Sequence, residues 1–388
     1  MEGSWWKSRS ELSEEQEAII VLPIDGKYVV TGPPGCGKTN LLVLRAAYMT
    51  KAGLTNLKIL TFGKILNRFI LTGVVGKGLD PNQVEGYIRW SRRLATDQDS
   101  SNHEKFREIV GLEQSRRAIV AECKKIQGQL GSGAKIHQTI LVDEVQDLFS
   151  DELDVIIGAS DRVMLAGDIK QKVYQGGNAL HHAVAQLGFT VQQLNTHYRM
   201  GHAIAKIADR ISEPNHPSES LLATCNYAES KMQSSAELME LTSREEQFDR
   251  LVAKLKTQRK AYPRELIGVL VAQNAVIADL RECFAATDLV DDVVFHGDEG
   301  TDFSSDKRIH VMTIVAAKGT EFRAVHLYAA EQVANAQDTP TFWYTAVTRA
   351  KTSLIVYASP GDRPLSRILK AGFADETQVP DLDSLFDE

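Results

Sequence analysis

The sequence lacks any apolar run that approaches the roughly 20 residues of a membrane-spanning helix. Its N-terminal stretch has no basic segment followed by an apolar one, so we expect no signal peptide. The four cysteines lie far apart without metal-ligand spacing, which favours a reduced, cytoplasmic protein without disulfides. An excess of basic residues is also missing, since the net charge is -7. This charge balance excludes a protein that coats nucleic acid by bulk charge. Any binding of nucleic acid therefore needs a local basic groove.

The length of 388 residues is too great for one hydrophobic core and predicts two domains. Short apolar runs alternate with longer helical patterns, which predicts an α/β fold with parallel sheets flanked by helices. The predicted strands are 27–31, 57–62, 139–143 and 162–166 in the first half, and 266–271, 310–315, 324–328 and 353–357 in the second. We place the first domain at residues 1–190 and the second at 191–374.

Two segments differ from this pattern. Residues from about 73–138 lack clear strand patterning and are predicted to form a small helical insertion rich in basic side chains. Those side chains form either a solvated helical face or a contact with a phosphate backbone. Residues 375–388 form an acidic tail, which is either a disordered solubilising segment or a docking peptide for a partner protein.

The motif GPPGCGKT at 32–39 lies between a predicted strand and a predicted helix, the context that a phosphate-binding P-loop requires. Its glycines allow backbone N–H groups to turn inward around phosphates, and the helix N-terminus adds a favourable dipole. Lys38 is suited to neutralise the β and γ phosphates, and Thr39 to bind Mg2+. The residues expected to contact nucleotide here are Gly32, Gly35, Gly37, Lys38, Thr39 and Asn40.

Gln16 lies upstream of the P-loop and has two interpretations. Together with Ser13 it fits a capping box, which would explain both residues by helix capping alone. A glutamine at this distance before a P-loop can also bind adenine, accepting from N6 and donating to N7.

Two carboxylates, Asp143 and Glu144, follow an apolar strand in the motif DEVQD at 143–147. Asp143 is suited to hold Mg2+ through water, and Glu144 to polarise the attacking water. The next strand runs into GDIKQ at 167–171, where Gln171 is a candidate sensor of the γ-phosphate.

Hydrolysis also needs positive charge on the departing phosphoryl group, and the first half supplies only Lys38. The second half offers Arg199 and Arg349. Each is either an ordinary surface arginine or a finger delivered across a domain cleft, so that catalysis occurs only when the domains close.

The order of these elements resembles superfamily 1 helicases of the UvrD-like type over nearly the whole chain. The resemblance is carried by Gln16, the P-loop, Thr61-Phe62, DEVQD, GDIKQ, Tyr198-Arg199, KGTEF at 318–322 and YTAVTRA at 344–350. It implies two RecA-like domains, with ATP and Mg2+ in the cleft between them and a single strand crossing above. The implied contacts are Gln16 with adenine, Glu321 with the ribose side, and Gln171, Arg199 and Arg349 with the γ-phosphate.

The chain departs from that family in the parts that would bind a strand. Large inserted subdomains are reduced to 73–138, so we expect little duplex unwinding by this chain alone. Where relatives have a tyrosine-x-tryptophan-type segment that stacks on bases, this chain keeps only Tyr174. Tyr174 and Phe62 would then form a smaller platform for base stacking, unless Phe62 packs in the core. Lys64 is expected to contact phosphate. YTAVTRA also resembles the RecD branch, whose members move in the opposite direction, so both polarities stay open.

The sequence therefore predicts ATP-dependent translocation on single-stranded nucleic acid, with DNA favoured over RNA and DNA helicase activity second. The alternative is a regulatory ATPase that controls a partner nuclease in nucleic-acid processing or anti-phage defence. A nucleotide kinase or GTPase would not place Arg199 and Arg349 in a second sheet, and no NKxD-type guanine signature is present.

Overall fold

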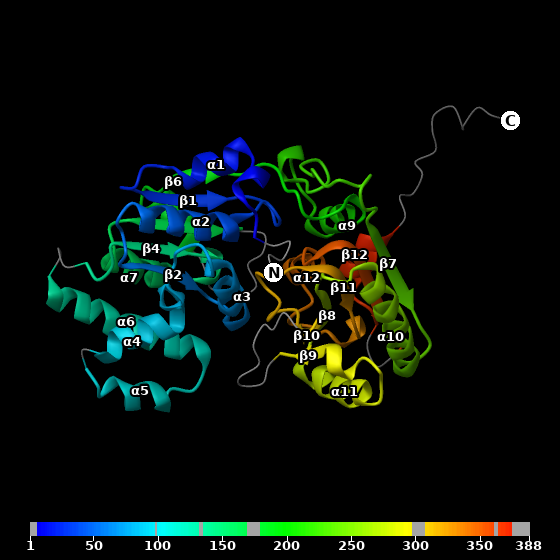
Figure 1. Ribbon diagram of the computed structural model, residues 1–388. Helices are drawn as coiled ribbons and strands as arrows, with labels where there is room; N and C mark the ends of the chain where they lie inside the picture. Colours follow the sequence, from blue (N-terminus) through cyan, green and yellow to red (C-terminus); the bar gives the residue numbers. More distant parts are fainter. Residues whose placement is uncertain are drawn as a thin grey trace.

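The computed structural model describes residues 6–97, 99–131, 135–168, 179–296, 307–360 and 364–374. In this part of the chain, twelve strands form two six-stranded sheets in which neighbouring strands run parallel. The two sheets lie side by side, the first on the left and the second on the right of Figure 1. The predicted α/β class, with two parallel sheets flanked by helices, is confirmed. No helix in the described ranges is both long and apolar enough to cross a membrane.

The strand order of the first sheet is β3-β2-β4-β5-β1-β6. Its strands are β1 (Lys27–Thr31), β2 (Leu57–Thr61), β3 (Val84–Gly86), β4 (Thr139–Val142), β5 (Val163–Gly167) and β6 (Thr190–Gln193). Because successive strand residues point to opposite faces, Val30 and Ile59 join one helical layer while Val29 and Leu60 join the other. One layer contains α1 (Glu14–Ile20), α2 (Lys38–Lys51) and α3 (Lys64–Val74). The other contains α4 (Tyr87–Asp97), α5 (Asn102–Glu108), α6 (Leu112–Leu130), α7 (Ser150–Ala159) and α8 (Ala179–Ala185).

The strand order of the second sheet is β7-β12-β11-β8-β10-β9. Its strands are β7 (Ser235–Glu240), β8 (Ile267–Val271), β9 (Val293–Phe295), β10 (Ile309–Thr313), β11 (Phe322–Leu327) and β12 (Ala350–Ala358). Val269 and Val311 pack against α10 (Arg244–Ala261) and α11 (Asn274–Ala285) on one face. Leu270 and Met312 face α9 (His202–Ser212), α12 (Pro340–Val347) and α13 (Arg367–Phe373) on the other.

The eight predicted strands all form, with ends shifted by a few residues, and the four that the sequence did not reveal are the edge strands of the two sheets. β3 and β9 are only three residues long, and β6 and β7 are largely exposed. A central parallel strand is buried on both faces and gives a continuous apolar run, whereas an edge strand does not. β6 carries the first sheet to Gln193, past the division proposed at 190/191, and β3 lies inside the segment 73–138 that was expected to be helical.

The two halves meet where Leu66 of α3 packs on Gly319 of the second half. A Cβ atom at Gly319 would lie 2.8 Å from the Leu66 methyl carbons, and the residue has φ 76. Both the close approach and the left-handed backbone require glycine here. The P-loop follows β1, DEVQD follows β4 and Lys318 follows β10, so the motifs gather at the carboxyl ends of the strands, between the sheets.

Candidate nucleotide site

The P-loop forms a tight turn between β1 and α2. Gly35 and Gly37 have φ values of 86 and 94, which an L side chain rarely adopts. The Lys38 ammonium donates to the carbonyl of Gly32 at 2.7 Å and to that of Pro33 at 3.0 Å, so the side chain folds back over its own loop. The loop and its lysine thus take the compact form that the motif predicts.

Thr39 and Asp143 come together from the P-loop and the end of β4. The Thr39 hydroxyl donates to Asp143 Oδ2 at 2.6 Å, and the Glu144 N–H donates to Asp143 Oδ1 at 3.0 Å. Burial, and next the neighbouring Glu144 carboxylate, raise the pKa of Asp143 to about 7. Glu144 itself has φ 56, an uncommon backbone for a residue other than glycine, and its carboxylate accepts from the Gln146 amide.

These oxygen atoms fit Mg2+. A hydroxyl and a carboxylate are hard donors, and Mg2+ is usually held by one or two carboxylates together with water and phosphate oxygens. The described residues contain no cluster of three or more His, Cys, Asp or Glu side chains able to hold a metal ion. Thr39 and Asp143 would therefore hold the ion only as part of a shell that nucleotide and water complete.

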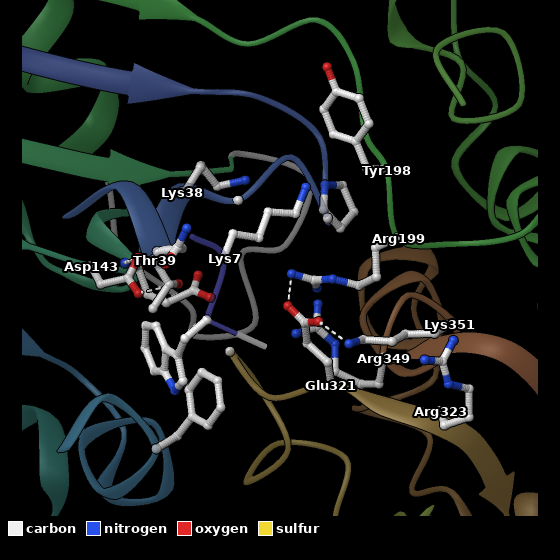
Figure 2. Close-up of a pocket in the computed structure, with 18 of the residues that line it drawn as sticks. Lys7, Lys38, Thr39, Asp143, Tyr198, Arg199, Glu321, Arg323, Arg349 and Lys351 are labelled. Carbon is white, nitrogen blue, oxygen red and sulfur yellow. Dashed lines mark hydrogen bonds and ion pairs between the residues drawn. The ribbon is translucent and has the colours of Figure 1, made fainter. Parts of the chain in front are cut away.

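Cationic side chains from both halves line the same cavity, which has a volume of about 230 Å³ (Figure 2). The first half contributes the P-loop, Thr39 and Asp143, and the second contributes Arg199, Arg349 and Lys351. Of the other predicted nucleotide residues, Gly35, Gly37, Lys38, Asn40 and Glu144 also line the cavity, whereas Gln16 and Gly32 do not. Arg199 lies against the P-loop, since a Cβ atom at Gly35 would lie 3.0 Å from the Arg199 Cβ. Glu321 also lines this cavity.

Arg199 and Lys351 both contact the Glu321 carboxylate. Arg199 forms an ion pair with Glu321 Oε1, and the Lys351 ammonium lies 3.4 Å from Oε2. Burial lowers the pKa of Arg199 to about 9, with Arg349 acting in the same direction, and burial together with Arg199 lowers that of Lys351 to about 7. Arg349 is 2% exposed, and its guanidinium donates to the carbonyls of Thr345 at 2.9 Å and Thr320 at 3.1 Å.

Lys318 crosses between the halves. Its ammonium donates to Asp147 Oδ1 at 2.6 Å and lies 3.9 Å from Glu144 Oε2. The side chains of Lys318 and Asp147 are 6% and 2% exposed, so this is a buried ion pair. Burial raises the pKa of Asp147 to about 6, although Lys318 opposes that shift. The pair connects the DEVQD motif to the KGTEF motif of the other half.

Gln16 reaches the P-loop but uses its amide within the protein. Its Oε1 accepts from the Ser13 N–H at 3.1 Å, which completes the capping box of α1. Its Nε2 donates to the Cys36 carbonyl at 2.8 Å, and the residue is 2% exposed. The capping interpretation therefore describes the contacts seen, while the contact with adenine stays a prediction.

Phe62 and Lys64, two of the residues predicted to bind a strand, do not line this cavity. Phe62 is half-buried, with the Arg116 guanidinium 4.6 Å from its ring centroid, and Lys64 is exposed at the start of α3. Phe62 packs against the core of the first half, while its stacking on bases stays a prediction. Tyr174, Gln171 and the acidic tail 375–388 lie outside the described residues.

The basic side chains of the segment 73–138 are mostly matched by carboxylates. Eight of its eleven lysines and arginines form ion pairs, namely Arg89, Arg93, Lys105, Arg116, Arg117, Lys124, Lys125 and Lys135. Arg116 is buried at 3% exposure and pairs with Glu152. This pattern favours the solvated, ion-paired face over a surface that contacts phosphate.

Several cavity residues carried no predicted role. They are Trp6, Lys7, Phe69, Tyr198, Tyr227, Arg323 and Lys351. Lys351 follows Arg349 by two residues, so a search for further cations beside Arg349 would have found it. Trp6 and Lys7 belong to no motif, and nothing in the local sequence indicates where they lie.

Residues 308–357, from β10 to most of β12, match the family of the UvrD-like helicase C-terminal domain. No curated protein matches the chain in sequence. Among solved structures, a PRRSV helicase is similar with a TM-score of 0.43 and 13% identity, over 89% of this chain and 54% of that one, so this chain spans about half its length. The matched segment contains KGTEF and YTAVTRA, two of the motifs on which the resemblance was based. The match of residues 308–357 to this family model supports the resemblance to superfamily 1 helicases of the UvrD-like type.

Proposed function

We propose that the chain hydrolyses ATP in the cavity between its two halves and uses that hydrolysis to move along a single strand of nucleic acid. The observation that carries this proposal is the composition of the cavity. It joins Lys38, Thr39 and Asp143 of one half to Arg199 and Arg349 of the other. A site divided in this way couples the state of the nucleotide to the separation of the halves.

In this proposal each side chain has one task. Lys38 and the amides at the start of α2 bind the phosphates, and Glu144 orients and polarises the attacking water. Thr39 and Asp143 hold Mg2+, which supplies charge neutralisation on the phosphates when bound. Arg349 and Arg199 stabilise the charge that develops on the departing phosphoryl group, because arginine presents fixed donors and stays protonated. Glu321 would release Arg199 for this contact while keeping Lys351 as its partner.

The contact with nucleic acid rests on fewer residues. Phe62 and Tyr174 are proposed to stack on bases, and Lys64 to contact the backbone. The match of residues 308–357 to the UvrD-like helicase C-terminal domain supports a nucleic-acid substrate, and we propose DNA in preference to RNA. The short insertion favours translocation as the main activity and strand separation as the secondary one.

Steady-state ATPase assays with single-stranded DNA, duplex DNA and single-stranded RNA test the proposal. We expect single strands to raise turnover manyfold, and Lys38→Ala to abolish it. Lys64→Ala is a matched control in the same half, and should keep basal turnover while losing part of the stimulation. Strand displacement on duplexes with a 5' or a 3' tail then gives the polarity. Turnover that no nucleic acid stimulates would contradict translocation and favour the regulatory ATPase.

A further inference from the structure

Trp6 is anchored in a slot on α3. Its indole stacks on Phe69 with ring centroids 5.0 Å apart and an interplanar angle of 21°. The indole N–H donates to the Thr72 hydroxyl at 3.1 Å. A Cβ atom at Gly73 would lie 2.3 Å from the indole, so a larger residue there would collide with the ring. The helix therefore has a position shaped for this tryptophan.

The chain is held again just after Lys7. The Ser8 N–H and hydroxyl both donate to the Glu11 carboxylate, at 2.9 Å and 2.8 Å, and this turn leads through Leu12 into α1. Leu12 packs against a hydrophobic core cluster that contains residues of both halves. Lys7 thus lies on a short bridge between two fixed points, α3 and α1.

The bridge directs Lys7 into the cavity, where Figure 2 shows its side chain between Lys38 and Arg199. The Lys7 ammonium lies 4.7 Å from the centroid of the Tyr198 ring. Burial lowers the pKa of Lys7, with Glu11 opposing and Arg199 reinforcing the shift. In the described part of the chain, no carboxylate lies within ion-pair distance of this ammonium.

The cavity is lined by more cationic side chains than carboxylates. The cations that line it are Lys7, Lys38, Arg199, Arg323, Arg349 and Lys351, and the carboxylates are Asp143, Glu144 and Glu321. Glu321 is shared by Arg199 and Lys351, and Asp143 accepts from Thr39. A partly desolvated ammonium is stabilised by an anion, and a phosphate oxygen is a stronger partner than the face of a tyrosine.

We propose that the segment Trp6–Lys7 is a wall of the nucleotide site and that Lys7 binds a phosphate of the nucleotide directly. This inference rests on the proposed function. It adds a nucleotide-binding residue that no motif contains, held in place by the contacts of Trp6 with α3. The ligand class is a nucleoside di- or triphosphate, and the contact is with its phosphates and not with its base.

Isothermal titration of the full chain with ATP, ADP and adenosine tests this contact. Lys7→Met keeps the side-chain stem and removes the charge, so affinity for ATP and ADP should fall about tenfold, as expected for one charge-assisted hydrogen bond, with adenosine unchanged. Arg9→Met is the matched control, because Arg9 lies two residues away on the same segment with its side chain 86% exposed and paired to Glu17. It should bind all three ligands as the wild type does.

Trp6→Ala tests the anchor. It should weaken ATP binding as much as Lys7→Met, and the double variant should bind no more weakly than either single one, because both changes remove the same contact. Equal thermal unfolding midpoints for Lys7→Met and wild type show that the variant folds.

The results of these titrations distinguish a failure of the Lys7 contact from a failure of the proposed function. If wild type does not bind ATP, or if Lys38→Ala binds ATP as wild type does, the proposed function fails and the inference with it. If Lys38→Ala loses ATP binding while Lys7→Met keeps it, the inference alone is overturned. An equal loss of adenosine binding in Lys7→Met would also overturn it, since the contact would then not be with phosphate.

Discussion

Replacing Lys318 by methionine should destabilise the chain in a way that depends on pH. The substitution keeps the volume of the stem but removes the partner of the Asp147 carboxylate, which lies 2.6 Å from the Lys318 ammonium in a buried environment. Breaking a buried pair by removing one partner costs about 3–5 kcal/mol when the remaining charge stays ionised. Here the remaining group can bind a proton, which limits the cost at low pH.

The sign follows from the pKa of Asp147. Its folded-state pKa is about 6, above the ordinary value of 3.8, so its contribution to stability is fully present below pH 3.8 and is lost as the pH rises through 6. Lys318 lowers this pKa, so the variant has a still higher one and the loss continues to higher pH. The free energies of unfolding should therefore nearly coincide at pH 5 and diverge above pH 6, by about 1.4 kcal/mol per pH unit until the variant pKa is passed.

Urea unfolding followed by tryptophan fluorescence at pH 5 and pH 8 measures this difference. By pH 8 the variant should be less stable by about 3 kcal/mol. Lys254→Met is the matched control, because its ion pair with Glu237 is 40% and 47% exposed and should contribute less than about 1 kcal/mol at either pH. Adding Asp147→Asn should restore most of the loss. An equal loss at pH 5 and pH 8, or a double variant as unstable as Lys318→Met, would refute this reasoning.

Three further substitutions address the site and its surroundings. Arg349→Ala should lower kcat for ATP hydrolysis by about 1,000-fold or more in single-turnover assays while nucleotide binding is retained, and unchanged turnover would remove its role as a finger. Arg116→Met should lower the free energy of unfolding by about 3–5 kcal/mol, because it leaves the buried Glu152 unpaired. Adding Glu152→Met to this variant should recover much of the lost stability, and an Arg116→Met variant as stable as wild type would contradict the reasoning. Phe62→Ala should weaken single-strand binding by about 1–3 kcal/mol in fluorescence anisotropy with KM for ATP unchanged, whereas lost stability with unchanged strand affinity would assign the ring to packing against Arg116.

The fold could be predicted to the extent that burial leaves a mark on local sequence. Central strands such as β4 and β8 are buried on both faces and give uninterrupted apolar runs. The edge strands β6 and β7 alternate or are polar, so their pattern resembles a loop. β6 is the last strand of the first sheet and one of the least buried, so the local sequence does not mark where that sheet ends.

The site could be predicted only where backbone geometry and function require a fixed spacing. The P-loop, Asp143 and Glu144 are local motifs, and each is recognisable within a few residues. The partner of Asp147 is 171 residues away, and its identity depends on how the two sheets are set against each other. That setting comes from contacts such as Leu66 against Gly319, which no local pattern encodes. Gly319 and Lys318 are adjacent, so the glycine that lets α3 approach also places the lysine against the opposite carboxylate. The KGTEF motif contains both Lys318 and Gly319, but only the packing of the two halves determines that Lys318 contacts Asp147 and Gly319 contacts Leu66.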